Sequence, residues 1–147
     1  MNSKTSEWYE VAFRYEKILE DGTEKTVTEQ FVVEALSFTE AEQMILKELG
    51  QYLKGEYFVQ AIKKAIYKEV FFDNDKKEEK WYKAKLQFVT IKEKTGIEKH
   101  FNVVYLVQSN SLNAACKAID KIMVNSATEY ESVSIQETKI VEVFPHE

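Results

Sequence analysis

The chain has 147 residues, of which 44% are hydrophobic and 13% aromatic, and its formal net charge is -5. This length suffices for one ordinary globular core or two small cores, and one proline with four glycines excludes a collagen-like or linker-like chain. No apolar run approaches the roughly 20 residues that a membrane-spanning helix needs, no secretory signal opens the sequence, and a single cysteine excludes an internal disulfide. We therefore expect a soluble cytoplasmic protein that does not associate with membranes.

A β-hairpin is predicted first along the chain. Between residues 9 and 16, apolar and polar side chains alternate with the period of two that marks a strand with one buried face. The sequence EDGTEK then supplies Gly22 for the positive φ of a tight turn. A second strand follows, and its apolar face carries Phe31, Val33 and Ala35.

A helix is predicted after this hairpin. Ser37 stands in the N-cap position with Glu40 three residues later, which is the spacing of a capping box. Apolar residues then recur at helical spacing, and the predicted buried stripe consists of Phe38, Ala41, Ile45, Leu49 and Tyr52. We expect this stripe to pack against the sheet.

The second half of the chain repeats the pattern of the first. The sequence WYEVAFRYEKILEDGTEK aligns with the later sequence WYKAKLQFVTIKEKTGIEK. The equivalent pairs include Trp8 with Trp81, Ser37 with Ser111, and Glu69 with Glu142. We predict a tandem duplication, with a first β-β-α-β repeat at 1–73, a charged linker at 74–80 and a second repeat at 81–147, which together can form one compact domain.

The last segment of the first repeat, 57–71, is open to two interpretations. Its apolar residues recur every four positions, as in a helix: Phe58, Ile62, Ile66 and Val70. Its counterpart ESVSIQETKIVEVF is rich in Val, Ile, Ser and Thr, which favour a strand. Because equivalent positions should share a conformation, we predict two long strands, bulged near Lys63–Lys64 and near Glu137–Thr138.

These elements define the predicted fold class as α+β. It consists of two β-β-α-β units related by an approximate twofold, with an antiparallel sheet whose helices lie on one side.

The stretches WYEVAFRYEK, VTEQFVVEALSFTEAE and ETKIVEVFPHE resemble a domain-of-unknown-function family of Bacteroidota and of the phages and mobile elements that infect them. The motif ALSFTEAE is the most specific part, and the resemblance extends over nearly the whole chain. It implies an intracellular protein of phage or prophage origin. It assigns no catalytic or binding residues.

Sequence patterns for catalysis or metal binding are missing. The chain lacks the motifs GxxxxGK[ST], GxGxxG and GxSxG, and DNDKKEE lacks the central glycine of a calcium loop. His100 and His146 do not have the spacing of zinc ligands. Cys116 falls in the second helix beside its apolar stripe, which favours a buried or half-buried thiol over a nucleophile paired with His100. We predict a non-enzymatic protein with no catalytic residues, no metal and no cofactor.

In the second repeat, one strand face carries Trp81 together with Lys83 and Lys85, and Lys63 and Lys64 can add charge from a neighbouring strand. Trp8 and Trp81 are in phase with the outward side chains of their strands, and an aromatic platform with lysines holds single-stranded nucleic acid by base stacking and charge. The predicted nucleic-acid-binding residues are Trp8, Trp81, Lys63, Lys64, Lys83 and Lys85. The alternative interpretation is that the tryptophans cover a sheet edge or the interface between the repeats, while the lysines are ordinary solvated residues.

Two functions are therefore compatible with the sequence. The first is a nucleic-acid-binding protein that serves the DNA metabolism of a phage or mobile element. The second is an interaction or ligand-sequestering protein that blocks a host defence component, and whose partner is a host protein or a nucleotide signal.

Overall fold

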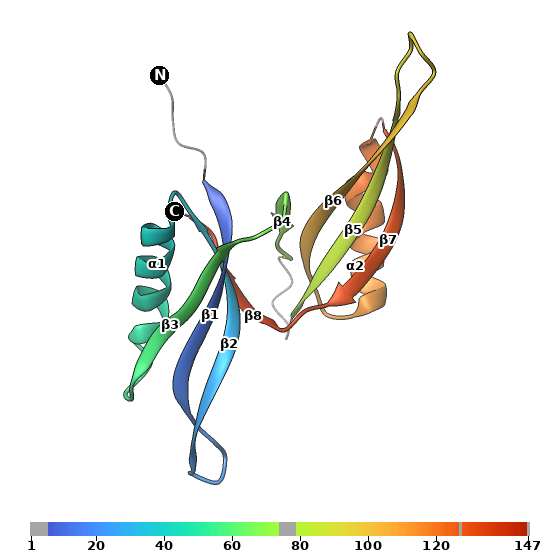
Figure 1. The fold of residues 1–147 in the computed structure, drawn as a ribbon. Coiled ribbons are helices and arrows are strands. Elements are labelled where there is room, and N and C mark those ends of the chain that lie inside the picture. Colours follow the sequence, from blue (N-terminus) through green and yellow to red (C-terminus); the bar gives the residue numbers. More distant parts are fainter. Residues whose placement is uncertain (1–5, 74–78, 127, 147) are drawn as a thin grey trace. The chain divides into compact units, whose positions relative to one another are not determined.

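The computed structural model describes residues 6–73, 79–126 and 128–146, and it has the predicted α+β fold with two similar halves (Figure 1). The first half contains β1 (Glu7–Ile18), β2 (Glu24–Ala35), α1 (Phe38–Gly50), β3 (Tyr57–Lys64) and β4 (Glu69–Phe71). The second half contains β5 (Lys80–Ile91), β6 (Glu98–Ser109), α2 (Leu112–Ile122), the 3-10 turn η1 (Met123–Asn125), β7 (Glu129–Glu137) and β8 (Ile140–Phe144). Most of the predicted linker, 74–78, lies outside the described residues.

The strands form two four-stranded sheets, with the orders β3-β1-β2-β8 and β4-β6-β5-β7. In each sheet the hairpin and the strand after the helix pair in antiparallel fashion. The fourth strand is parallel to its neighbour and comes from the other half of the sequence. Unit 1 therefore comprises the chain up to Ala65 together with the chain from Lys139 onward, and unit 2 comprises Ile66–Thr138. The repeat in the sequence and the compact unit in space have different boundaries.

The predicted single long strand over 57–71 is wrong, because β3 and β4 belong to different sheets. The partner strand β1 begins at Glu7, and β3 pairs with it as far as Lys64, which lies opposite Tyr9. The last bond is donated by the N–H of Ala65 to the C=O of Trp8 at 2.8 Å. At the equivalent place the N–H of Thr138 donates to the C=O of Trp81, also at 2.8 Å. Both tryptophans thus mark the corner where the chain leaves its sheet.

Each strand after the helix carries a β-bulge at an equivalent residue. Gln60 is the extra residue in β3 and Val133 is the extra residue in β7. The bulges predicted near Lys63–Lys64 and Glu137–Thr138 are wrong in position, because at those places the strands end.

The predicted turns and helix caps are present in both halves. Gly22 and Gly96 take the positive φ values of 84° and 67° at the hairpin turns. Ser37 Oγ accepts a hydrogen bond from the backbone N–H of Glu40 at 3.1 Å, which satisfies an otherwise unpaired amide of the first turn of α1. Ser111 Oγ caps α2 in the same way, also at 3.1 Å.

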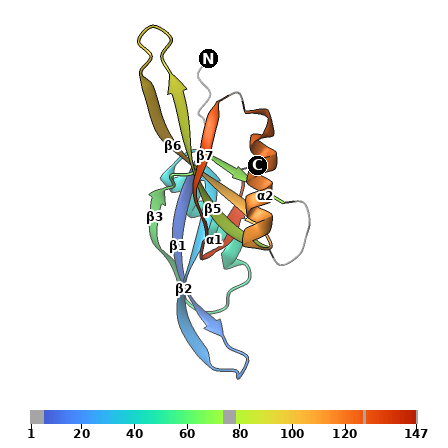
Figure 2. The ribbon, with the colours of Figure 1, turned by 90° about the vertical axis from the view of Figure 1, so that its right-hand side faces the viewer.

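Each helix covers one face of its own sheet, as Figure 2 shows for α2. In unit 1, Ala41 and Ile45 of α1 are fully buried against Phe13 and its neighbours. The predicted stripe is correct at its centre and wrong at both ends, because Phe38 is 46% exposed, and Tyr52 lies beyond the helix and is 79% exposed. In unit 2, the buried helix residue Ile119 packs against a corresponding core on the sheet. No helix among the described residues is long and apolar enough to cross a membrane.

The exchanged strands β8 and β4 are held in their sheets by equivalent aromatic contacts. Phe144 of β8 stacks on Phe31 of β2 with ring centroids 6.2 Å apart. Phe71 of β4 packs edge-on against Tyr105 of β6 with ring centroids 5.4 Å apart. Each half of the sequence therefore completes the sheet of the other half with an apolar anchor.

The chain after each exchanged strand is fixed by an equivalent hydrogen bond. The backbone N–H of His146 donates to Glu34 Oε1 at 3.0 Å, and the backbone N–H of Asp73 donates to Gln108 Oε1 at 3.0 Å. Glu34 and Gln108 are paired by the repeat alignment, so the strand exchange itself is part of the duplicated structure.

Candidate functional site

The six residues predicted to bind nucleic acid are divided between the two units. Unit 1 contains Trp8, Lys63 and Lys64, and unit 2 contains Trp81, Lys83 and Lys85. Lys63 and Lys64 belong to β3, which pairs with β1 and not with the strand that carries Lys83 and Lys85. The structure therefore does not join the six residues into one strand face.

The prediction that Trp81 faces solvent is wrong, because its side chain is only 3% exposed. Phe72 packs edge-on against the indole ring, with ring centroids 5.3 Å apart and an interplanar angle of 89°. Alternation along a strand indicates which residues share a face, but it does not reveal whether another segment covers that face. Trp8 is half-buried. A buried indole offers no open ring face for stacking on a nucleic-acid base.

The predicted lysines also differ from one another in their charge environment. Lys63 Nζ lies 3.3 Å from Glu10 Oε2, and Lys64 Nζ lies 3.0 Å from Glu7 Oε2. These two ammonium groups are already compensated by carboxylates on β1. Lys83 and Lys85 are half-buried on β5, and neither makes an ion pair with any residue that the structure describes.

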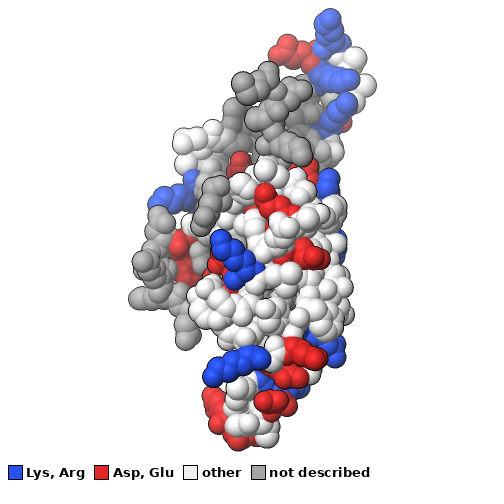
Figure 3. All heavy atoms as spheres, turned by 90° about the vertical axis from the view of Figure 1, so that its left-hand side faces the viewer, with Lys and Arg blue, Asp and Glu red and all other residues white. Residues whose placement is uncertain are grey.

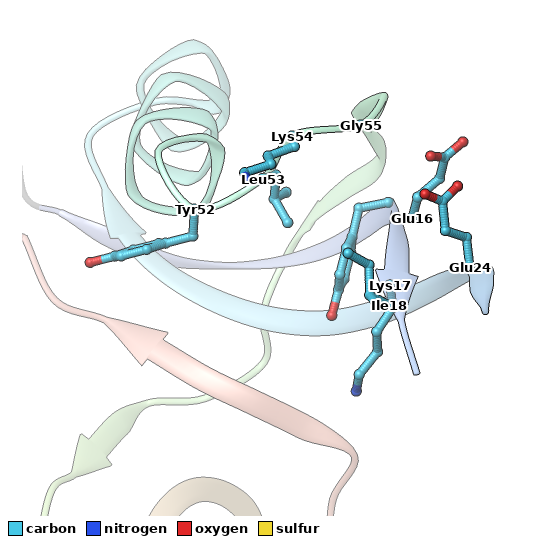
Figure 4. Close-up of a pocket in the computed structure, with 9 residues that line it drawn as sticks. Glu16, Lys17, Ile18, Glu24, Tyr52, Leu53, Lys54 and Gly55 are labelled. Atoms are coloured by element: carbon cyan, nitrogen blue, oxygen red, sulfur yellow. The ribbon is translucent and has the colours of Figure 1, made fainter. Parts of the chain in front are cut away.

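A groove that sequence reasoning did not predict lies on the β1–β2 hairpin of unit 1, where the hairpin extends beyond the end of α1 (Figure 4). Two hollows of about 420 and 200 Å³ share Tyr15, Tyr52 and Leu53, and we call them together the hairpin groove. The remaining lining residues are Phe13, Glu16, Lys17, Ile18, Glu24, Glu29, Phe31, Leu49, Lys54, Gly55, Val141 and Glu142. In Figure 4, Tyr52 lies at one end of the larger hollow, Leu53 and Lys54 lie in its middle, and Glu16 and Glu24 lie at the other end.

Beside the hairpin groove, the outer edge of β2 is only partly covered. The exchanged strand β8 pairs with β2 from Gln30 to Val33. The earlier part of β2, residues 24–29, pairs with β1 on one side, and no described strand pairs with its other side. An uncovered strand edge presents backbone N–H and C=O groups that another strand can pair with.

The hairpin groove combines apolar walls with an excess of carboxylates. Four glutamates line it, Glu16, Glu24, Glu29 and Glu142, against two lysines. Figure 3, which views this side of the molecule, shows acidic side chains gathered with a few basic ones at the lower end, over the β1–β2 hairpin.

Two groups in the hairpin groove have shifted pKa values. Burial, followed by the hydrogen bond that the Tyr15 hydroxyl donates to the Glu29 carboxylate, raises the pKa of Tyr15 to about 12. Desolvation of its carboxyl group, followed by the nearby charge of Glu48, raises the pKa of Glu142 above its usual range. Both shifts arise mainly from burial, and the neighbouring carboxylates Glu29 and Glu48 add to them.

A second kind of groove occurs at equivalent positions in both units, between the helix and the end of the exchanged strand. In unit 1 the α1–β8 groove has a volume of about 410 Å³ and is lined by Glu40, Met44, Lys47, Glu48, Phe144, Pro145 and His146. In unit 2 the α2–β4 groove has a volume of about 540 Å³. It is lined by Phe71, Phe72, Asp73, Val107, Gln108, Ser109, Ala114, Lys117, Ala118, Lys121 and Ile122.

Sequence reasoning missed these grooves because its only measure of exposure was the phase of each residue along a strand or helix. One signal was present. Ala114 and Ala118 stand where the first repeat has Glu40 and Met44, and this loss of side-chain volume within a duplicated helix indicates a hollow.

The histidines and the cysteine are not gathered into a reactive centre. His100 Nε2 lies 3.4 Å from Glu98, and His146 Nε2 lies 2.9 Å from Glu40. Cys116 is a half-buried free thiol. Across the described parts of the chain, no three His, Cys, Asp or Glu side chains come together in a way that would hold a metal ion.

Comparison with known proteins adds a family but no activity. A family model described as "Domain of unknown function (DUF4494)" matches residues 7–146, which is nearly the whole chain and includes both units. The comparison with curated proteins gives no match. The chain, with its duplicated and strand-exchanged fold, therefore belongs to the DUF4494 family.

Proposed function

We propose that the protein is a non-enzymatic interaction protein that binds an extended, basic segment of a partner protein along β2 of unit 1. The observation that carries the proposal is the free edge at residues 24–29 of β2, which lies beside an apolar and acidic groove. An extended peptide can add to such an edge through its backbone, and its alternate side chains then fill neighbouring pockets. Apolar side chains of the partner would contact Tyr15 and Tyr52, and its lysines or arginines would meet the glutamates.

The proposed setting is the cytoplasm of a bacterium that carries a phage or mobile element, with a host defence protein as the partner. The resemblance of the sequence to a family of phages and mobile elements supports this setting. The asymmetric charge of the hairpin groove supports a partner with a basic segment.

Selection from a displayed library of short peptides tests the proposal even while the partner is unidentified. We expect the enriched peptides to alternate apolar residues with Lys or Arg. Their affinity should fall by about tenfold or more in the Tyr52→Ala variant, because an exposed aromatic residue in a binding groove is a typical hot spot. Glu24→Lys should lower the affinity for the same peptides, because the new lysine repels their basic side chains.

The matched control for these variants is Ile97→Ala. Ile97 is 57% exposed and lies beside the turn of the equivalent hairpin of unit 2, so it should leave the affinity unchanged. Enriched peptides without basic residues, or equal losses in Tyr52→Ala and Ile97→Ala, would count against the proposal.

Single-stranded nucleic acid is the second candidate ligand. Its support comes from Lys83 and Lys85, the two predicted lysines that make no ion pair with a described residue. Fluorescence anisotropy with labelled single-stranded DNA at low and moderate salt tests it. If the lysines contact phosphates, Lys83→Ala and Lys85→Ala should each reduce the salt slope by about one contact. Binding that is insensitive to both changes would remove this candidate.

A further inference from the structure

The α2–β4 groove of unit 2 has a larger volume than its counterpart, and two of the helix residues that line it are small. Ala114 and Ala118 line the groove where the first repeat has Glu40 and Met44. The volume is correspondingly larger, about 540 Å³ against about 410 Å³. A hollow of this size falls within the range of small-molecule sites, which is roughly 300–1,000 Å³.

The rim of the α2–β4 groove has a positive charge. Lys117 and Lys121 are exposed on α2 one helical turn apart, and neither ammonium group pairs with a carboxylate within the part of the chain that the structure describes. Among the described lining residues Asp73 is the acidic one, so lysines outnumber carboxylates there by two to one. In the α1–β8 groove, by contrast, Lys47 is accompanied by Glu40 and Glu48.

The walls of the α2–β4 groove are apolar and partly aromatic. Val107 is a buried lining residue, and Phe71 and Phe72 also line the groove. The Phe72 ring is 45% exposed although it is held edge-on against Trp81. An exposed ring that is held in place favours the stacking of another planar ring.

We infer that the α2–β4 groove is a binding site for a small anion that carries a planar aromatic ring. The ring would lie in the hollow above Ala114 and Ala118 against Phe72, and the anionic group would meet Lys117 and Lys121. This site lies in unit 2 and does not depend on the binding proposed for β2 of unit 1.

The full chain with Trp8→Phe provides a direct readout, because Trp81 is then its only tryptophan and contacts a wall of the groove. We expect anilinonaphthalene sulfonate, a fluorescent planar anion, to bind with saturation and to change the Trp81 emission. Adenosine monophosphate should displace the probe, whereas uncharged adenosine and the alkyl anion decanoate should displace it much less.

Variants of the helix then locate the site. Ala118→Met restores the bulk found in the first repeat and should weaken probe binding by about tenfold or more. Lys117→Ala and Lys121→Ala should each weaken it by about two- to five-fold, with a smaller loss at high salt. Lys47→Ala, which changes the lysine equivalent to Lys121 in unit 1, is the matched control and should have no effect.

Several results would overturn the inference. These are a lack of saturable binding by the wild-type chain, undiminished binding by Ala118→Met, or equal losses in Lys47→Ala and Lys121→Ala. Displacement by decanoate as strong as that by adenosine monophosphate would exclude the requirement for a planar ring. If a polyglutamate peptide displaces the probe and adenosine monophosphate does not, the occupant is an acidic polypeptide and not a small molecule.

Discussion

The two units have the same backbone plan, but their grooves differ in charge. The helix caps, the β-bulges and the hydrogen bonds at the tryptophan corners recur at equivalent positions with nearly equal distances. The residues that line the grooves do not recur in this way. Unit 1 has an acidic hairpin groove, and its α1–β8 groove contains Glu40 bound to His146, whereas the equivalent groove of unit 2 is open and lined by lysines. The duplication has therefore retained the groups that satisfy the backbone, while the side chains that face solvent have diverged.

The strand exchange gives a reason why the two units keep the same backbone plan. Each helix-covered hairpin would expose a long edge of its second strand, and an exposed edge invites association with other chains. The strand β8 covers part of this edge in unit 1, and β4 covers part of it in unit 2. Neither half of the sequence contains all the strands of its own sheet.

The largest expected effect tests whether the two cores are equivalent. Ile45 and Ile119 are both completely buried, so Ile45→Ala and Ile119→Ala should each lower the free energy of unfolding by about 2–5 kcal/mol. Ile66→Ala, at a residue that is 62% exposed, is the control and should have little effect. The measurement is chemical denaturation, and a negligible loss for either buried residue would mean that its helix is misplaced.

A smaller effect should reveal the strand exchange itself. Phe144→Ala removes the stacking of β8 on Phe31 and should cost about 1–3 kcal/mol, because the ring is half-buried. The destabilisation should appear in unit 1, although Phe144 belongs to the second repeat. Hydrogen exchange should therefore become faster at the β2 amides and remain unchanged in β6.

The reciprocal variant of this test is Phe71→Ala, which should accelerate exchange in β6 and leave β2 unchanged. Acceleration in the half of the sequence that contains the mutation would show that the strands are not exchanged.

The helix caps should give closely matched effects. Ser37→Ala and Ser111→Ala each remove a hydrogen bond of 3.1 Å to the first turn of a helix and should each cost about 1 kcal/mol. In unit 1 the side chain of Glu40 also accepts the N–H of Leu36 at 2.9 Å, which is the reciprocal half of a capping box. Glu40→Ala should therefore destabilise the protein, whereas Ala114 offers no such bond to lose.

The smallest expected effect concerns the pH dependence of unit 1. The pKa of Glu142 is raised above its ordinary value of 4.5 in the folded state, so its ionisation favours the unfolded state. The protonated carboxyl group of Glu142 therefore favours the folded state at a pH below that ordinary value, and this contribution to the free energy of unfolding is lost as the pH rises through the folded pKa. Glu142→Gln should accordingly be more stable than the wild type at neutral pH and equal to it in acid. Thermal unfolding across this range measures the difference, and a variant less stable than the wild type at neutral pH would contradict the assignment.

The duplicated α+β fold could be predicted from the sequence because its signals are local. The period of two in β1, the glycine of each hairpin turn and the caps at Ser37 and Ser111 depend only on neighbouring residues. The path of 57–71 could not be predicted in this way. Its strand character is local, but its division between two sheets depends on where β1 begins.

The candidate site was less accessible to sequence reasoning. Alternation along a strand could not show that Trp81 is buried, or that Lys63 and Lys64 lie beside Glu10 and Glu7. The unpaired part of β2 results from the short length of β8 and from the register of their pairing, which only the assembled sheet displays.

The most direct test of the proposed function is hydrogen–deuterium exchange of the full chain with a peptide selected for binding. If the peptide adds as a strand to β2, every second amide of residues 24–29 should become protected, because the amides that face away from β1 acquire partners that no described strand provides. The equivalent amides of β6 should remain unprotected, since Glu16 and Glu29 of the hairpin groove correspond to Val89 and Val103 in the second repeat. Protection confined to residues 24–29 is the result we predict. Equal protection of both hairpins, or protection elsewhere with β2 unchanged, would contradict the proposed binding site.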